Sequence, residues 1–192
     1  GSGPIFASAN TVNHSHSADG SPATADATAP AEHDIVTALF DLGRQVTAVL
    51  DLEDLLPQIP RLVGRLISFE AFAVYLLDDR RNELTVAYSL GYPQRDTPIR
   101  LKPGKGLIGT AVASEQPLLV NDLSADPRYI EFVPGMNSEV VVPLMHKSRP
   151  IGALNLLSRH RDHFNQRDVA ILRQFAAHVA IALVNARLFE QS

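Results

Sequence analysis

A glycine-rich stretch from Gly104 to Gly109 is the first segment whose residue types and spacing could do chemistry. It has the pattern that cradles the pyrophosphate of a dinucleotide, and Asp122 follows near the distance at which that fold places a ribose-binding acid. The first strand of such a fold is buried on both faces, whereas the segment before these glycines contains Pro98 and Arg100. We therefore interpret the glycines as a turn that opens a short helix, where glycine permits a positive φ.

The polar stretch before the last predicted helix contains three side chains that could bind a metal, His160, Asp162 and His163. A flexible loop lacks the outer hydrogen bonds that orient metal ligands, so we interpret this stretch as a solvated loop. His146 in a predicted turn and His178 on a predicted helix face are not interpreted as haem ligands, because neither shows an aligned apolar pocket. The sequence therefore predicts no metal site.

Cysteine is absent from the 192 residues. Its absence excludes disulfides, thiolate metal sites, cysteine nucleophiles and thioether-linked chromophores. No other acid, base and nucleophile occur in a pattern that indicates a catalytic set. We therefore predict no catalytic residues and no enzymatic activity.

The composition is that of a globular domain, with 45% hydrophobic and 20% charged residues. A formal charge of -4 opposes a basic nucleic-acid-binding face. No purely apolar run approaches the roughly 20 residues that cross a bilayer. We predict a cytoplasmic protein that binds neither nucleic acid nor membrane.

The chain divides into two regions by composition. Residues 1–32 are rich in Ser, Ala, Thr, Asp, Pro and Gly, so that ordering them would bury little apolar surface. We predict a disordered tail or linker there and one folded domain over residues 33–192.

Apolar residues recur at three- and four-residue intervals in three places, which predicts helices. The first helix covers about residues 34–50, and residues 52–67 form a helical region that two prolines start or kink. The last helix begins at Asn165, a capping residue, and Asp168 can bond back to the first turn. Its apolar surface is wide enough to contact the sheet and also the first helix or a copy of it in a second chain.

The strands are predicted from aromatic and branched residues between polar turns. These segments are two hairpins (69–77 with 83–90, and 139–145 with 151–157), two short strands (98–101 and 118–120) and a short helix between them (107–115).

Taken in order, several motifs from about residue 34 to the end resemble the GAF domain family. They are Gly104 to Gly109, Val120-Asn121-Asp122, Asp126-Pro127-Arg128-Tyr129, Ser138 to Leu144, Arg149 to Leu156 and Ala180 to Phe189. The resemblance implies an α+β, PAS-like fold with an antiparallel sheet of about six strands. It also implies that the amino- and carboxyl-terminal helices pack on one face and that a ligand cavity lies under a short helix and loop on the other.

The resemblance leaves the cofactor unassigned, because GAF domains are known with cyclic nucleotides, bilins, haem, small metabolites or nothing. Asn155, Phe164 and Asp168 match part of the cyclic-nucleotide signature of the family. Leu156 and Val169 stand where that signature has its Lys and Glu, so we interpret Phe164 and Asp168 as helix-capping residues instead.

By the same resemblance, the loop that contains Asn121, Asp122 and Tyr129 borders the cavity. These residues, with Tyr75 and Tyr88 from the first predicted hairpin, are our predicted ligand-binding set. The alternative for the loop is an Asx turn at Asn121-Asp122 and a packed Tyr129.

The resemblance implies a small-molecule-sensing regulatory domain, the input module of a longer bacterial signalling protein. We expect a homodimer through the terminal helices and a carboxyl-terminal output domain beyond this chain. The alternative is a ligand-free dimerisation scaffold with the same fold. Some GAF proteins reduce free methionine sulfoxide, but that chemistry needs cysteine thiols, which this chain lacks.

Overall fold

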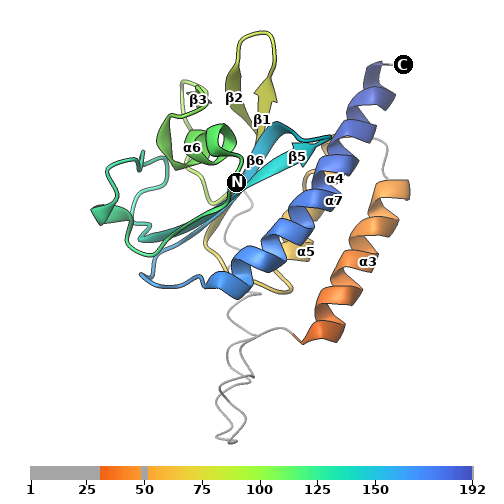
Figure 1. Cartoon of the computed structure of the whole chain (residues 1–192), viewed down its shortest axis with the longest axis horizontal. Coiled ribbons are helices and arrows are strands. Elements are labelled where there is room, and N and C mark those ends of the chain that lie inside the picture. Colours follow the sequence, from red (N-terminus) through yellow and green to blue (C-terminus); the bar gives the residue numbers. More distant parts are fainter. Residues whose placement is uncertain (1–30, 49–51, 192) are drawn as a thin grey trace, which may run out of the picture.

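The computed structural model describes residues 31–48 and 52–191 (Figure 1). The predicted tail of residues 1–32 therefore falls almost entirely outside the described residues. Each element predicted from periodicity within the described residues is present, with ends shifted by a few residues.

A six-stranded antiparallel sheet forms the centre of the domain, in the order β3-β2-β1-β6-β5-β4. Its strands are β1 (Ala71–Asp78), β2 (Glu83–Leu90), β3 (Arg100–Leu101), β4 (Leu118–Val120), β5 (Ser138–His146) and β6 (Arg149–Ser158). The two predicted hairpins, β1–β2 and β5–β6, meet through β1 and β6 in the middle of the sheet. The predicted α+β fold is confirmed.

Helices cover both faces of this sheet. They are α3 (Glu32–Ala48), α4 (Leu52–Leu55), α5 (Gln58–Val63), α6 (Gly106–Ser114), the 3-10 helix η2 (Leu123–Ala125) and α7 (Gln166–Gln191). α7 lies along one face of the sheet with α3 beside it, and α6 lies on the opposite face (Figure 1). α3 and α7 run in the same direction, and Arg167 at the start of α7 lies 4.0 Å from the Glu32 carboxylate.

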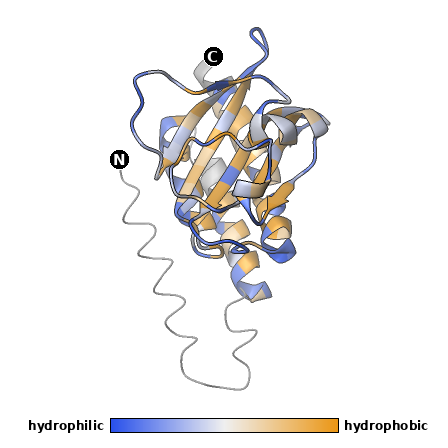
Figure 2. Ribbon diagram, turned by 90° about the vertical axis from the view of Figure 1, so that its left-hand side faces the viewer, coloured by the Kyte–Doolittle hydropathy of each residue, from blue (hydrophilic) through white to orange (hydrophobic). Residues whose placement is uncertain are grey.

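The sheet separates two hydrophobic cores because successive side chains of a strand point to opposite faces. In β1, Phe72 and Val74 pack with the helix-side core, whereas Ala73 and Tyr75 pack with the core under α6. Figure 2 shows hydrophobic residues along the strands and hydrophilic residues in most of the loops. The sheet therefore separates the α6 side from the terminal helices.

The start of α7 has the predicted capping arrangement. Asn165 Oδ1 accepts from the Asp168 backbone N–H at 2.9 Å, and Asp168 Oδ2 accepts from the Asn165 N–H at 3.0 Å. Phe164 is buried in the helix-side core. These bonds satisfy donors that the first turn would otherwise leave open.

α7 is the longest helix among the described residues. Over Gln166–Arg187 it is long and apolar enough, by length and composition alone, to cross a membrane. More than half of that window, 56%, is buried inside the fold. This is the pattern of a helix in the core of a globular domain, where one side packs on a sheet.

Candidate ligand pocket

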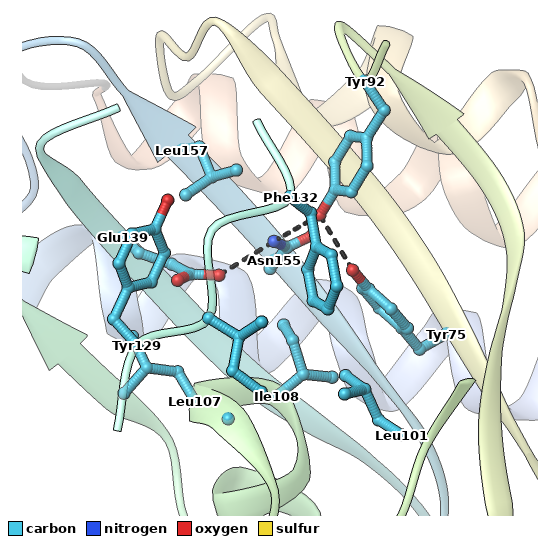
Figure 3. Close-up of a pocket in the computed structure, with 12 residues that line it drawn as sticks. Tyr75, Tyr92, Leu101, Leu107, Ile108, Tyr129, Phe132, Glu139, Asn155 and Leu157 are labelled. Atoms are coloured by element: carbon cyan, nitrogen blue, oxygen red, sulfur yellow. Dashed lines mark hydrogen bonds between the residues drawn. The ribbon is translucent and has the colours of Figure 1, made fainter. Parts of the chain in front are cut away.

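A pocket lies between the sheet and α6, on the face opposite the terminal helices (Figure 3). Twelve side chains or glycines line it: Tyr75, Tyr92, Leu101, Gly106, Leu107, Ile108, Tyr129, Ile130, Phe132, Glu139, Asn155 and Leu157. They come from strands β1, β3, β5 and β6, from the first turn of α6 and from two loops. The pocket is thus built where the short helix approaches the middle of the sheet.

A chain of hydrogen bonds crosses the floor of the pocket. Asn155 Nδ2 donates to Glu139 Oε2 at 2.9 Å and to the Tyr92 hydroxyl at 2.9 Å. The Tyr92 and Tyr75 hydroxyls lie 3.0 Å apart. Figure 3 shows Asn155 in the centre of this chain, with Glu139 on one side and both tyrosines on the other.

Glu139 is a buried carboxyl group in the interior of the sheet. It is 3% exposed, on a strand whose pairing places it beside Leu157 of β6 and Val120 of β4. Burial raises its pKa from 4.5 to about 7, because desolvation penalises the ionised form more than the Asn155 bond stabilises it. At neutral pH both the protonated and the ionised form of this carboxyl are therefore populated.

Two polar atoms of the pocket have no hydrogen-bond partner among the described residues. They are Asn155 Oδ1 and the Tyr129 hydroxyl, and both are buried. A buried polar atom without a partner costs about 1–3 kcal/mol, so such atoms are rare and often mark a binding site. Burial also raises the pKa of Tyr129 to about 12 and that of Tyr75 and Tyr92 above their ordinary values, which keeps the phenols protonated.

Residues 126–137, here named the cover loop, close the pocket from the outside. The loop contributes Tyr129, Ile130 and Phe132 to the lining, and the Arg95 guanidinium lies over the Phe132 ring, 5.3 Å from its centroid. With the loop in this position the free space inside is about 10 Å³. That volume admits a single water molecule, so any larger ligand requires the cover loop to move.

The sequence was then compared with known proteins. The family model described as "GAF domain" matches residues 49–184. The chain belongs to the GAF domain family.

Relatives of this GAF domain include regulators and enzymes. It is 25% identical over 171 residues to the formate hydrogenlyase transcriptional activator of Salmonella typhimurium (strain SL1344), and the match covers 83% of the chain but 25% of the activator. The structure of free methionine-R-sulfoxide reductase from Neisseria meningitidis in complex with its substrate aligns with a TM-score of 0.72 and 26% identity, over 83% of this chain and 95% of that one.

The fold also matches a GAF domain of a different parent protein. The GAF domain of a phosphoenolpyruvate-protein phosphotransferase from Coxiella burnetii aligns with a TM-score of 0.74 and 21% identity, over 83% of this chain and 98% of that one. At this identity the likeness concerns the fold alone. The same fold thus occurs in proteins with different names and activities, so the fold alone does not determine the function of this GAF domain.

The structure brings two of the five predicted ligand-binding residues into the pocket. Tyr75 and Tyr129 line it. Tyr88 packs against the helix-side core, because it pairs with Val74 across the β1–β2 ladder and shares the face of that residue.

Asn121 and Asp122 lie elsewhere, beside a wide open groove with a volume of about 450 Å³ next to strand β4. Asp122 Oδ1 accepts from the Ser124 backbone N–H at 3.1 Å and from the Ser124 hydroxyl at 2.6 Å, which caps η2 and lowers the Asp122 pKa. The Asx turn considered as the alternative for this segment is therefore present.

Sequence reasoning missed three of the pocket's polar residues, Tyr92, Glu139 and Asn155, as a ligand-binding set. Glu139 directly precedes the apolar run Val140–Leu144. An acidic residue at the edge of such a run is usually exposed, so this position carries no local signal of burial.

The histidines considered as metal ligands have other contacts. His163 Nε2 lies 2.9 Å from both the Ser68 hydroxyl and the Ser68 carbonyl oxygen, and its ring packs edge-on against Phe164. Within residues 31–48 and 52–191, no three His, Asp or Glu side chains are arranged to hold a metal ion. As predicted, residues 159–162 of the loop before α7 are exposed, and His163 attaches the end of the loop to the body of the domain through Ser68.

Proposed function

We propose that this GAF domain is a small-molecule-sensing regulatory module of a longer bacterial signalling protein. The observation that carries the proposal is the pair of buried, unpartnered polar atoms on Asn155 and Tyr129 beside the buried Glu139 carboxyl. A bound molecule would satisfy these atoms, and its binding free energy would offset the cost of burying them. The match to a quarter of a transcriptional activator's length supports a place within a longer regulator.

We further propose that the domain binds its ligand without converting it. The substrate-bound relative is named as a methionine sulfoxide reductase, and the sequence of this chain contains no thiol for such chemistry. The lining of the pocket offers one carboxyl group, one amide and three phenols, which suit recognition by hydrogen bonds.

The sheet offers a route from the pocket to the terminal helices. Glu139 and Val141 of β5 point to the pocket side, and Val140 between them packs in the helix-side core with α7. A ligand that moves β5 by its bonds to Glu139 would change the packing of α7. The ligand would shift the equilibrium between two arrangements of the helices only if it binds one arrangement more tightly than the other.

We propose that the terminal helices also form a homodimer. Val36 and Phe40 on α3 and Ile181 on α7 are exposed at 62%, 65% and 48%. Apolar side chains at three- and four-residue spacing on adjacent helices are typical of a helix–helix interface.

Ile181→Asp should therefore convert a dimer to a monomer in sedimentation analysis, whereas Ala113→Asp on the exposed side of α6 should leave the mass unchanged. A dimer that persists in Ile181→Asp would contradict this interface.

A ligand-free dimerisation scaffold is the second candidate, and the closed pocket favours it. The free volume of about 10 Å³ indicates a pocket filled by the domain's own side chains. In this case the unpartnered atoms would cost stability without serving a ligand.

Native mass spectrometry of the purified chain, followed by thermal shifts with nucleotides, amino acids and amines, separates the two candidates. For the sensor, we expect a retained small mass or an upward shift in Tm that grows with ligand concentration. Asn155→Leu should abolish the shift, while the matched Asn121→Ala in the open groove should preserve it. A dimer with no added mass and no shift with any compound would favour the scaffold.

A further inference from the structure

The pocket has an unbalanced charge. Of its twelve lining residues, Glu139 alone carries a formal charge, and no Lys, Arg or His is among them. Its carboxyl group accepts a hydrogen bond from the neutral Asn155 amide. A buried carboxylate is stabilised far more by a cation than by one neutral donor. A cationic ligand could therefore form an ion pair with Glu139.

The unpartnered atoms of the pocket are of the kind that accepts hydrogen bonds. Asn155 Oδ1 is an acceptor, and the Tyr129 hydroxyl can accept as well as donate. Together with the Glu139 carboxylate they give the lining of one pocket three acceptors. An ammonium group has three N–H donors and no acceptor, and this matches the set.

The remaining lining is aromatic and aliphatic. Tyr92, Tyr129 and Phe132 surround the polar centre, and Leu107 and Ile108 of α6 close it from below in Figure 3. Aromatic faces attract cations, and the Phe132 ring already lies 5.3 Å from the Arg95 guanidinium carbon. The body attached to the ammonium must be apolar to fit this lining.

We propose that the ligand of this pocket is an amine with an apolar body, whose ammonium group donates to the Glu139 carboxylate, Asn155 Oδ1 and the Tyr129 hydroxyl. The inference rests on the proposed sensing function and names the chemical class of its ligand. It predicts that amines bind more tightly than the corresponding free amino acids, because no lining side chain is a cation that would pair with their carboxylate.

Binding of such an amine is coupled to a proton. Burial raises the pKa of Glu139 to about 7, so the free domain at pH 7 holds the carboxyl about half protonated, and a bound ammonium ionises it. The other ionisable groups near it are Tyr75, Tyr92 and Tyr129, which stay protonated, and Asp126, whose pKa the Arg128 bond lowers. A proton released at pH 7 therefore comes from Glu139.

Isothermal titration calorimetry with 3-methylbutylamine and 2-phenylethylamine tests the proposal, with 3-methylbutanol and 2-phenylethanol as neutral counterparts and leucine and phenylalanine as zwitterions. Each amine should bind at least about tenfold more tightly than its alcohol and its amino acid. At pH 7, measurements in two buffers of different ionisation enthalpy should show a net release of protons when the amine binds.

Glu139→Gln, which keeps the shape of the side chain, should reduce amine affinity by about tenfold or more and remove the proton release. Glu131→Gln, an exposed acid on the cover loop, is the matched control and should behave like the unmodified domain. Unchanged amine binding in Glu139→Gln, or alcohols or amino acids that bind as tightly as amines, would overturn the inference. If nucleotides or other metabolites shift Tm and no amine does, sensing stands and the ligand class is wrong; if nothing binds, the proposed function fails with it.

Discussion

Glu139→Gln should raise the free energy of unfolding by about 3 kcal/mol at pH 8 and leave it nearly unchanged at pH 4, relative to the unmodified domain. The reason is the rise of the Glu139 pKa from 4.5 to about 7 on folding. Below pH 4.5 the carboxyl is protonated in both states, and its raised pKa carries no penalty. Between pH 4.5 and 7 the unfolded chain ionises this carboxyl while the folded domain keeps it protonated, so the unmodified domain loses stability progressively over this range, and the loss levels off above pH 7.

Denaturant unfolding at half-unit steps from pH 4 to pH 9 measures the difference between the two proteins. Other titrating groups act on both equally, so the difference curve isolates Glu139. Glu131→Gln, which removes an exposed carboxyl, should give a flat difference curve. A flat curve for Glu139→Gln as well would mean that the carboxyl is hydrated in solution and that the pocket opens freely. A stabilising substitution at this position is expected if the native residue is kept for binding rather than for stability.

Gly152→Ala should destabilise the domain by about 3 kcal/mol or more, because a methyl group at this position has no room. An added Cβ would lie 2.0 Å from the Tyr75 carbonyl oxygen and 3.1 Å from the Tyr75 carbonyl carbon. Gly152 lies on β6, where it pairs with Leu76 of β1 and Leu144 of β5. Since both neighbours are backbone in the middle of the sheet, the strands must separate to admit the methyl group.

Gly43→Ala provides the contrast for this measurement. No atom lies within 4 Å of a Cβ added there, and the residue is within α3. Alanine in a helix interior is more favourable than glycine by up to about 1 kcal/mol, so this variant should be slightly more stable. Urea unfolding of both variants gives the comparison. A decrease in the free energy of unfolding below about 1 kcal/mol in Gly152→Ala would show that β1 and β6 adjust easily. The position of Tyr75 in the pocket would then not be rigidly held.

The fold followed from local signals in the sequence. The start of α7 could be predicted because Asn165 and Asp168 complete a capping arrangement with each other, without help from distant residues. The hairpins could be predicted for a similar reason, since each joins strands that are neighbours in sequence. The pairing of β1 with β6, which unites the hairpins, has no such local signal, and the family resemblance implied only a sheet of about six strands without their order.

The pocket could be predicted only in part, and β2 shows why. Strict alternation would place Tyr88 and Val86 on the same face of the sheet. A register shift between Val74 and Tyr75 pairs Tyr88 with Val74 and Val86 with Tyr75, so the two residues face opposite cores. A β-bulge of this kind reverses the face of every residue beyond it, and alternation alone does not reveal it.

Glu139 was missed for a different reason. Its burial depends on the pairing of β5 with both β4 and β6 and on the cover loop, which are contacts between distant segments. An acidic residue at the start of a strand is usually exposed, and no local pattern indicates that a distant loop will cover Glu139.

The distribution of aromatic residues also determines how this domain can be observed. The chain contains four tyrosines and no tryptophan, and three of the four, Tyr75, Tyr92 and Tyr129, line the pocket. The tyrosine absorption and emission of the chain therefore arise mostly from rings that a ligand would touch, without the stronger signal of an indole elsewhere. Tyrosine emission of the unmodified chain can therefore be used to follow a ligand titration at the pocket, without an added fluorophore.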